Sequence, residues 1–143
     1  MTTTATVTAL PVGTTDTVLD RAADYLTRHG WNPGSLYDTH NACTAKCACH
    51  RTGSYPASMV GAIRAAVFGA PRWYLDTADP AALREYTAAV EWLNTYLIAH
   101  GPARLRAPVF AWETTPGRTR IHAIAALQYA ASAYRHHARR TAA

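Results

Sequence analysis

The chain has 143 residues, 49% of them hydrophobic, which is enough material for one compact domain and too little for two. Thirty residues are alanine, but only four are isoleucine and two are phenylalanine, so the composition favours closely packed helices and argues against an all-β sandwich or a parallel sheet. The formal net charge is +5, and no apolar run approaches the roughly 18–20 residues that span a bilayer, so we expect an all-α protein that is cytoplasmic and has no membrane partner.

The first fifteen residues are rich in threonine and show no apolar period. We expect a disordered tail over 1–15, followed by a single helical domain over 16–140. The opening sequence MTTTATVTALPVGTTD has neither a basic n-region nor an apolar h-region. A secretory signal is therefore not expected.

The first predicted helix covers residues 17–29. Asp16 is a suitable N-cap, and Gly30 is a suitable left-handed stop. Between them, apolar side chains recur at three- and four-residue spacing and predict one buried face: Val18, Leu19, Ala22, Tyr25 and Leu26. Trp31, just after the glycine, is expected to pack back against the last turn as a core residue.

An irregular stretch over 32–56 follows and contains all three cysteines of the chain. Loops of this length inside a compact domain are usually functional, tied by a metal or disordered. The segment HNACTAKCACH supplies five soft ligands in eleven residues, namely His40, Cys43, Cys47, Cys49 and His50. A Cys₃His set suits tetrahedral zinc, so zinc is a candidate cofactor, and free thiols in a mobile loop are the alternative.

Two further helices are expected over 57–68 and 80–100. In the first, Met59, Ala62, Ile63, Ala66 and Val67 share a face, and the small Gly61 would let another helix approach closely. The second begins at an Asp79-Pro80 cap and has its apolar line at Leu83, Tyr86, Val90, Leu93 and Leu97.

The last predicted helix covers 119–139, with Thr119 as its cap. Its inner stripe is expected at Ile121, Ile124, Ala125, Gln128 and Ala131, and the preceding APVFAWE is expected to be extended. The fold class predicted is therefore all-α, a compact bundle of about four helices with a long Cys/His loop.

The basic charge is concentrated near the C-terminus. Residues 1–103 hold seven basic and eight acidic residues, whereas residues 104–143 hold seven arginines and one acidic residue, Glu113. Such an asymmetry is found in proteins with anionic partners, and also in solvated basic tails. The candidate anion- or nucleic-acid-binding residues are Arg104, Arg106, Arg118, Arg120, Arg135, Arg139 and Arg140.

Three segments carry a resemblance: VLDRAADYLTRHGWNPG, MVGAIRAA and VFAWETTPGRTRIHAIAALQYAA. Together they resemble a family of small actinobacterial and actinophage proteins of unknown function. The chain departs from that family's pattern at Trp112-Glu113-Thr114, where members read Trp-Asn-Asp, and at Ser58-Met59-Val60, where members have a cysteine. The resemblance implies the helical architecture and transfers no catalytic residue.

These observations favour a small accessory protein that acts by binding rather than by catalysis and is associated with a phage or mobile element. Its partner would be a protein or a nucleic acid. One alternative is a nucleic-acid-binding regulator that uses the basic C-terminal third. Another is a zinc- or thiol-dependent enzyme centred on residues 40–50, although no local signature marks a nucleophile and its base.

Overall fold

The computed structural model describes residues 14–39, 55–100 and 107–142 of the chain. These contain the helices α1 (Thr15–His29), α3 (Met59–Phe68), α4 (Pro80–His100), α5 (Val109–Glu113) and α6 (Arg120–Ala142). Over the same ranges there is no strand, and β-type pairing is limited to two isolated bridges at Ala57. The predicted all-α class is confirmed. None of the described helices is long and apolar enough to cross a membrane.

Local capping explains where the helices begin. The Ser58 hydroxyl accepts from the Gly61 N–H at 3.0 Å and caps α3, and the Asp79 carboxylate accepts from the Ala82 N–H at 3.1 Å at the start of α4. At α6, Thr119 Oγ1 accepts from the His122 N–H, and His122 Nδ1 accepts from the Thr119 N–H in return. This reciprocal pair satisfies two backbone donors, as a capping box does.

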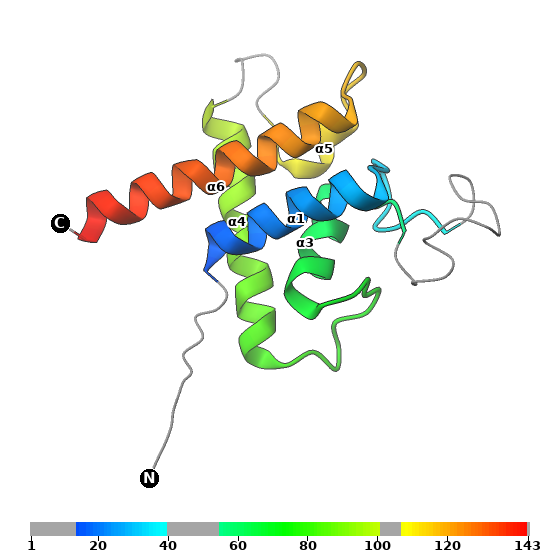
Figure 1. Ribbon diagram of the computed structural model, residues 1–143, viewed down its shortest axis with the longest axis horizontal. Coiled ribbons are helices and arrows are strands. Elements are labelled where there is room, and N and C mark those ends of the chain that lie inside the picture. Colours follow the sequence, from blue (N-terminus) through cyan, green and yellow to red (C-terminus); the bar gives the residue numbers. More distant parts are fainter. Residues whose placement is uncertain (1–13, 40–54, 101–106, 143) are drawn as a thin grey trace, which may run out of the picture.

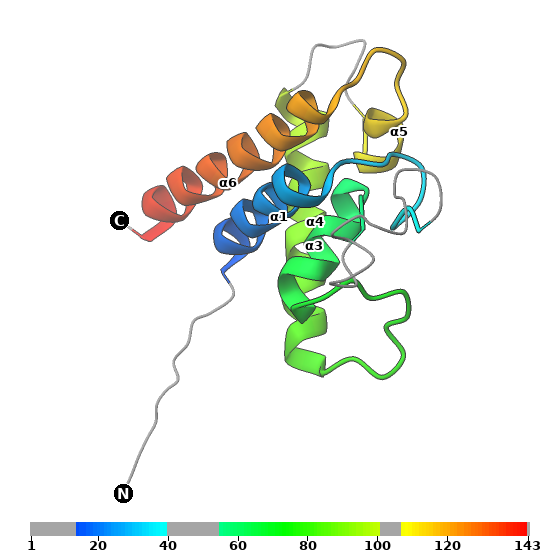
Figure 2. The same ribbon diagram turned by 45° about the vertical axis from the view of Figure 1, so that its right-hand side comes forward.

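The helices form two crossing groups. Figures 1 and 2 show α1 and α6 lying side by side and antiparallel, with α4 running across them and α3 beside α4. The far end of α6 extends beyond α1 (Figure 1). The ends of α1 and α6 are joined by Arg135, whose Nη1 lies 2.8 Å from Asp20 Oδ2 and 3.5 Å from Asp16 Oδ2.

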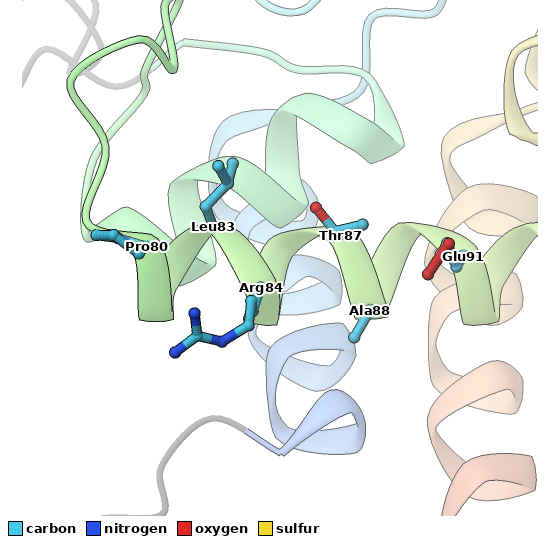
Figure 3. Close-up of a pocket in the computed structure, with 6 residues that line it drawn as sticks. All are labelled: Pro80, Leu83, Arg84, Thr87, Ala88 and Glu91. Carbon is cyan, nitrogen blue, oxygen red and sulfur yellow. The ribbon is translucent and has the colours of Figure 1, made fainter.

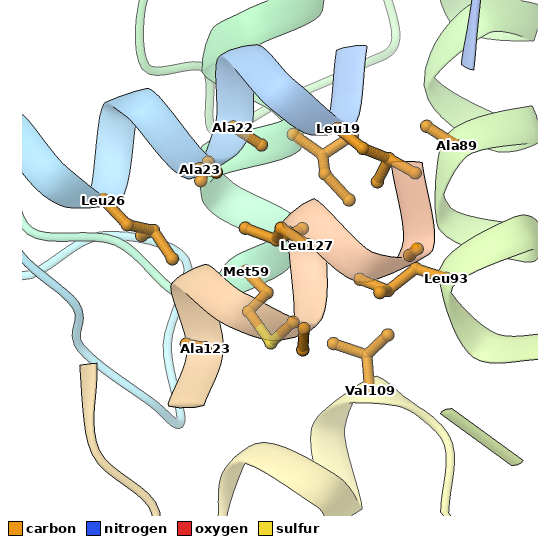
Figure 4. Close-up of a cluster of buried hydrophobic side chains, with 14 of the residues drawn as sticks. Leu19, Ala22, Ala23, Leu26, Met59, Ala89, Leu93, Val109, Ala123 and Leu127 are labelled. Atoms are coloured by element: carbon orange, nitrogen blue, oxygen red, sulfur yellow. The ribbon is translucent and has the colours of Figure 1, made fainter. Parts of the chain in front are cut away.

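One apolar core lies where these helices meet. Figure 4 shows Leu19 and Leu26 of α1 facing Leu127 of α6, with Met59 and Leu93 closing the cluster from α3 and α4. All five side chains are fully buried. Alanines fill most of the remaining inner positions, which lets the backbones of α1 and α6 approach closely.

The predicted inner faces are confirmed for α1, α3 and α4 in their main residues. Val18, Met59, Ile63 and Leu97 are buried as expected, whereas Leu83 of α4 is only partly buried. The N-cap of α1 is Thr14, two residues before the predicted Asp16, which lies in the first turn. The Asp16 carboxylate still lies near the positive end of the helix dipole, where a negative charge stabilises the helix.

Two predictions in the C-terminal third are wrong. The segment APVFAWE contains the short helix α5 rather than an extended strand. In α6, Ile121 is 75% exposed and Gln128 is exposed. Ala131 is buried as predicted, and Ile124 packs against the core. The other buried positions are Ala123, Ala126, Leu127 and Ala130. These follow the same three- and four-residue period, but alanine rather than the bulky isoleucine marks the inner face.

The two ends of the long loop are fixed to each other and to α3. The Ala57 N–H donates to the Gly30 carbonyl and the Asn32 N–H donates to the Ala57 carbonyl. Gly61 admits this backbone rather than another helix, because a Cβ at Gly61 would lie 2.2 Å from the Leu36 carbonyl oxygen. Tyr37 is buried at the same place and donates to the Gly61 carbonyl at 2.9 Å.

Candidate functional site

A basic aromatic pocket lies where α4, α5, the turn before α6 and α6 itself converge. Its volume is about 210 Å³. It is lined by two tyrosines, two histidines, one tryptophan, one arginine and small apolar residues, which are Tyr96, Leu97, His100, Trp112, Arg118, His122, Ala125, Ala126 and Tyr129. No carboxylate is present among these lining residues.

Arg118 is the charged centre of the basic aromatic pocket. Its Cζ lies 3.9 Å from the centroid of the Trp112 ring, so the guanidinium is held over the indole by a cation–π interaction. Its Nε donates to the Trp112 carbonyl at 3.1 Å. Among the described residues, Arg118 Nη2 is the one buried side-chain nitrogen or oxygen that has no hydrogen-bond partner. Burial lowers the pKa of Arg118.

The histidines and tyrosines of the pocket are ordered by local contacts. The rings of Tyr96 and His100 are stacked, with centroids 4.6 Å apart, as expected for residues four positions apart on a helix. His122 accepts at Nδ1 in the α6 cap, which leaves its Nε2–H as the ring donor. Tyr129 is 64% exposed. Burial, together with the neighbouring Tyr129, raises the pKa of Tyr96.

A second feature is the buried carboxylate of Glu113, at the end of α5. Its side chain is only 3% exposed. Oε2 accepts from Trp31 Nε1 at 2.7 Å and from the Met59 N–H at 2.8 Å. Burial raises the pKa of Glu113, and the two hydrogen bonds partly oppose that change. The carboxylate therefore joins α5 to the start of α3 and to the segment after α1.

A larger hollow lies along α4 and has a volume of about 490 Å³. Figure 3 shows that its six lining residues, from Pro80 to Glu91, all come from α4. Most of these side chains are exposed. A second element that would converge on a ligand is not among the lining residues, so this hollow is a poorer candidate than the basic aromatic pocket.

The structure does not bring the predicted arginines together. Arg118 lines the basic aromatic pocket, and Arg120, two positions later at the start of α6, is exposed and does not line it. Arg135 is paired with α1. Arg139 and Arg140 are exposed at the opposite end of α6, about 30 Å from Arg120 at the rise of an α-helix. Arg104 and Arg106 lie outside the described residues.

The predicted zinc ligands, His40, Cys43, Cys47, Cys49 and His50, all lie outside the described residues. Within 14–39, 55–100 and 107–142 there is no group of three or more His, Cys, Asp or Glu side chains that could hold a metal ion. Zinc binding by the loop stays a prediction.

Sequence reasoning missed the basic aromatic pocket because its residues come from four separate segments. The available signal is local: Tyr96 and His100 are four positions apart near one helix end, and His122 and Tyr129 are seven apart near another. Both spacings place side chains on a common helix face. Nothing in the spacing indicates that the two faces meet.

The chain belongs to a family of unknown function, DUF6197, whose model matches residues 11–133. The match covers all of α1, α3, α4 and α5 and most of α6. No curated protein and no solved structure matches the chain.

Proposed function

We propose that this protein acts by binding, and that its ligand is a small anion with an aromatic or other planar group held in the basic aromatic pocket. The observation that carries this proposal is Arg118, whose guanidinium is stacked on Trp112 and keeps unused donors beside a pocket without a carboxylate. A buried cationic donor without a partner is costly. An anion in the pocket would remove that cost.

The other lining residues suit the rest of such a ligand. Tyr96, His100 and Tyr129 offer ring faces for stacking, and His122 offers an N–H donor. The volume of about 210 Å³ is below the range of about 300–1,000 Å³ found for drug-sized ligands, which favours a small one. Association with a phage or mobile element is a further part of this proposal and rests only on the arginine- and alanine-rich composition and the sequence resemblance.

Phenyl phosphate is a suitable probe, because it combines a dianion with one aromatic ring. Isothermal titration calorimetry should show saturable binding that is stronger than that of inorganic phosphate and stronger than that of phenol. Arg118→Gln should weaken the binding about ten- to a hundredfold, since a charge-assisted hydrogen bond contributes about 1.5–3 kcal/mol.

Arg120→Gln is the matched control, because Arg120 is exposed and does not line the pocket. It should leave the affinity for phenyl phosphate unchanged. Equal losses in the two variants would indicate a diffuse charge effect and would contradict the pocket. An absence of saturable binding to the wild-type protein would contradict the proposal as a whole.

A further inference from the structure

A second pocket, separate from the basic aromatic pocket, lies against the carboxylate of Glu113. Its volume is about 280 Å³, and it lies between the segment after α1, the start of α3 and the short helix α5. Apart from Glu113 its walls are apolar or uncharged: Gly34, Ser35, Leu36, Ser58, Val60 and Phe110. We call it the Glu113 pocket.

The charge of Glu113 has no counter-charge in the described part of the molecule. Both hydrogen bonds to the carboxylate come from neutral donors, the Trp31 indole and the Met59 backbone, and both reach Oε2. No described residue donates to Oε1, and no described lysine, arginine or histidine lines the Glu113 pocket or forms an ion pair with the carboxylate. Glu113 as a whole residue is only 3% exposed, and burying a carboxylate without a cation is energetically unfavourable.

The rest of the Glu113 pocket is suited to an alkyl chain. Leu36 and Val60 supply aliphatic walls, and Phe110 is 66% exposed at the pocket. An exposed aromatic ring can pack on methylene groups and can also attract an ammonium group to its face. The arrangement combines one acceptor oxygen, one uncompensated negative charge and an apolar cavity.

We propose that the Glu113 pocket binds a primary alkylammonium group, with the ammonium donating to Glu113 Oε1 and the alkyl chain lying against Leu36, Val60 and Phe110. An alkylammonium supplies the missing charge and three donors at one end and buries apolar area at the other. The same chemistry is presented by a free amine and by a lysine side chain.

n-Butylammonium chloride tests the free amine, and Nα-acetyl-lysine methylamide tests the lysine side chain. Titrations near neutral pH should show saturable binding of at least one of the two. n-Butanol, which has the same chain without the charge, should bind at least tenfold more weakly than n-butylammonium, and the Nε-acetylated lysine derivative should bind at least tenfold more weakly than the lysine derivative. Which of the two amines binds more tightly identifies the source of the ligand.

Glu113→Gln is the decisive variant, because its amide oxygen can still accept from Trp31 and Met59 while the negative charge is lost. It should reduce amine binding at least tenfold. Glu91→Gln, which removes an exposed carboxylate beside the large hollow on α4, should leave binding unchanged. Phe110→Ala, at an exposed position, should weaken binding without lowering the melting temperature.

Unchanged amine binding in Glu113→Gln, or no saturable binding of either amine to the wild-type protein, would overturn the proposal. If Glu113→Gln does not fold, Phe110→Ala decides instead. Equal affinities of Phe110→Ala and the wild-type protein for the amines would then contradict the site. None of these outcomes depends on phenyl phosphate or on Arg118, so failure here is distinguishable from failure of the basic aromatic pocket.

Discussion

Glu113 is the residue on which three segments of the fold converge. Its carboxylate oxygen receives the Trp31 indole N–H and the first backbone N–H of α3, while its own backbone ends α5. In the sequence it stands out only as the one acidic residue of the basic C-terminal third and as part of a departure from the family's pattern. Its effect on stability follows from its burial and from the two donors that it satisfies.

Replacing Glu113 by alanine should destabilise the protein by about 2–5 kcal/mol, because two buried donors lose their acceptor and a cavity remains. Glu113→Gln keeps the acceptor and should cost much less. Chemical denaturation of both variants beside the wild-type protein measures the difference. Equal losses would show that the hydrogen bonds to Oε2 contribute little.

The pH dependence of stability provides a second test at Glu113. Burial raises its pKa in the folded state above the ordinary value of 4.5, so the folded protein holds this proton more tightly than the unfolded chain does. The contribution of this group to stability is therefore greatest below pH 4.5 and declines as the pH rises through the folded-state pKa. The unfolding free energy of the wild-type protein, relative to Glu113→Gln, should decrease over that interval. A constant difference across the interval would contradict the raised pKa.

Gly61 provides a test of close packing at a single residue. In an ordinary helix interior, Gly→Ala is favourable by about 1 kcal/mol. Here the added Cβ would lie 2.2 Å from the Leu36 carbonyl oxygen, which is backbone and must move. Gly61→Ala should therefore destabilise the protein by about 1–3 kcal/mol.

Gly69→Ala is the matched control for Gly61→Ala. Nothing lies within 4 Å of its added Cβ, but its backbone is left-handed with φ +84°. It should cost about 1 kcal/mol through backbone strain alone. A stabilised Gly61→Ala variant would mean that the segment around Leu36 does not pack on α3.

At the level of elements, α6 shows that the apolar period of an alanine-rich helix can be predicted from sequence while the face that is buried is not. The predicted and observed inner faces have the same period and share Ala131, but they differ in phase, since Ile121 is exposed and Ala123 is fully buried. Trp92 of α4 marks the true face, since its Nε1 donates to the Ala130 carbonyl at 2.8 Å.

Two truncations to alanine, one of a leucine and one of an isoleucine, test which face of α6 is buried. Leu127→Ala should destabilise the protein by about 2–5 kcal/mol, because Leu127 is fully buried and a cavity would remain. Ile121→Ala, at a position that is 75% exposed, should change stability by no more than about 0.5 kcal/mol. Thermal or denaturant unfolding of both variants measures the two losses of stability. A larger loss in Ile121→Ala than in Leu127→Ala would support the inner stripe predicted from sequence.

Helix positions were predictable because glycine, proline and capping residues mark them. Asp79-Pro80 and Thr119 each begin a helix as expected, and Gly69 ends one with a left-handed backbone. The helix α5 was not predictable, since its five residues are held by tertiary contacts rather than by a period of their own. Neither pocket was predictable, because each requires knowledge of which helix faces meet.

At the level of the whole molecule, the described arginines of the C-terminal third are spread along α6 and the turn before it rather than gathered in one patch. Arg135 is paired with two aspartates of α1, and Arg118 is half-buried over Trp112. Arg120, Arg139 and Arg140 remain exposed. A polyanion that lies along α6 would therefore meet fewer free arginines than the sequence suggests.

The salt dependence of nucleic-acid binding tests this distribution. Six neutralised phosphates, as expected from the sequence, give a log–log slope of about −5. If a duplex binds along α6, Arg139→Gln combined with Arg140→Gln should make the slope shallower by about 2, whereas Arg135→Gln should leave it unchanged. Binding that does not respond to salt would exclude an arginine mechanism, and no binding at low salt would exclude nucleic acid as the partner.

Metal content is the corresponding test for residues 40–50. If the loop binds zinc, protein purified without chelator should contain about one zinc per chain, and Cys47→Ser should lose it. Elemental analysis of the two proteins decides the matter. Three freely titratable thiols without zinc would exclude the cofactor.

The pairing of α1 with α6 has a consequence for how the protein is made. Arg135 and Asp20, which join these helices, are 115 positions apart, and the inner face of α6 is synthesised after every other described helix. Until then, Leu19 and Leu26 have no cover from Leu127, so the core cannot close while the chain is growing. A ribosome that stalls before α6 would hold an exposed apolar surface, and we expect such nascent chains to depend on chaperones.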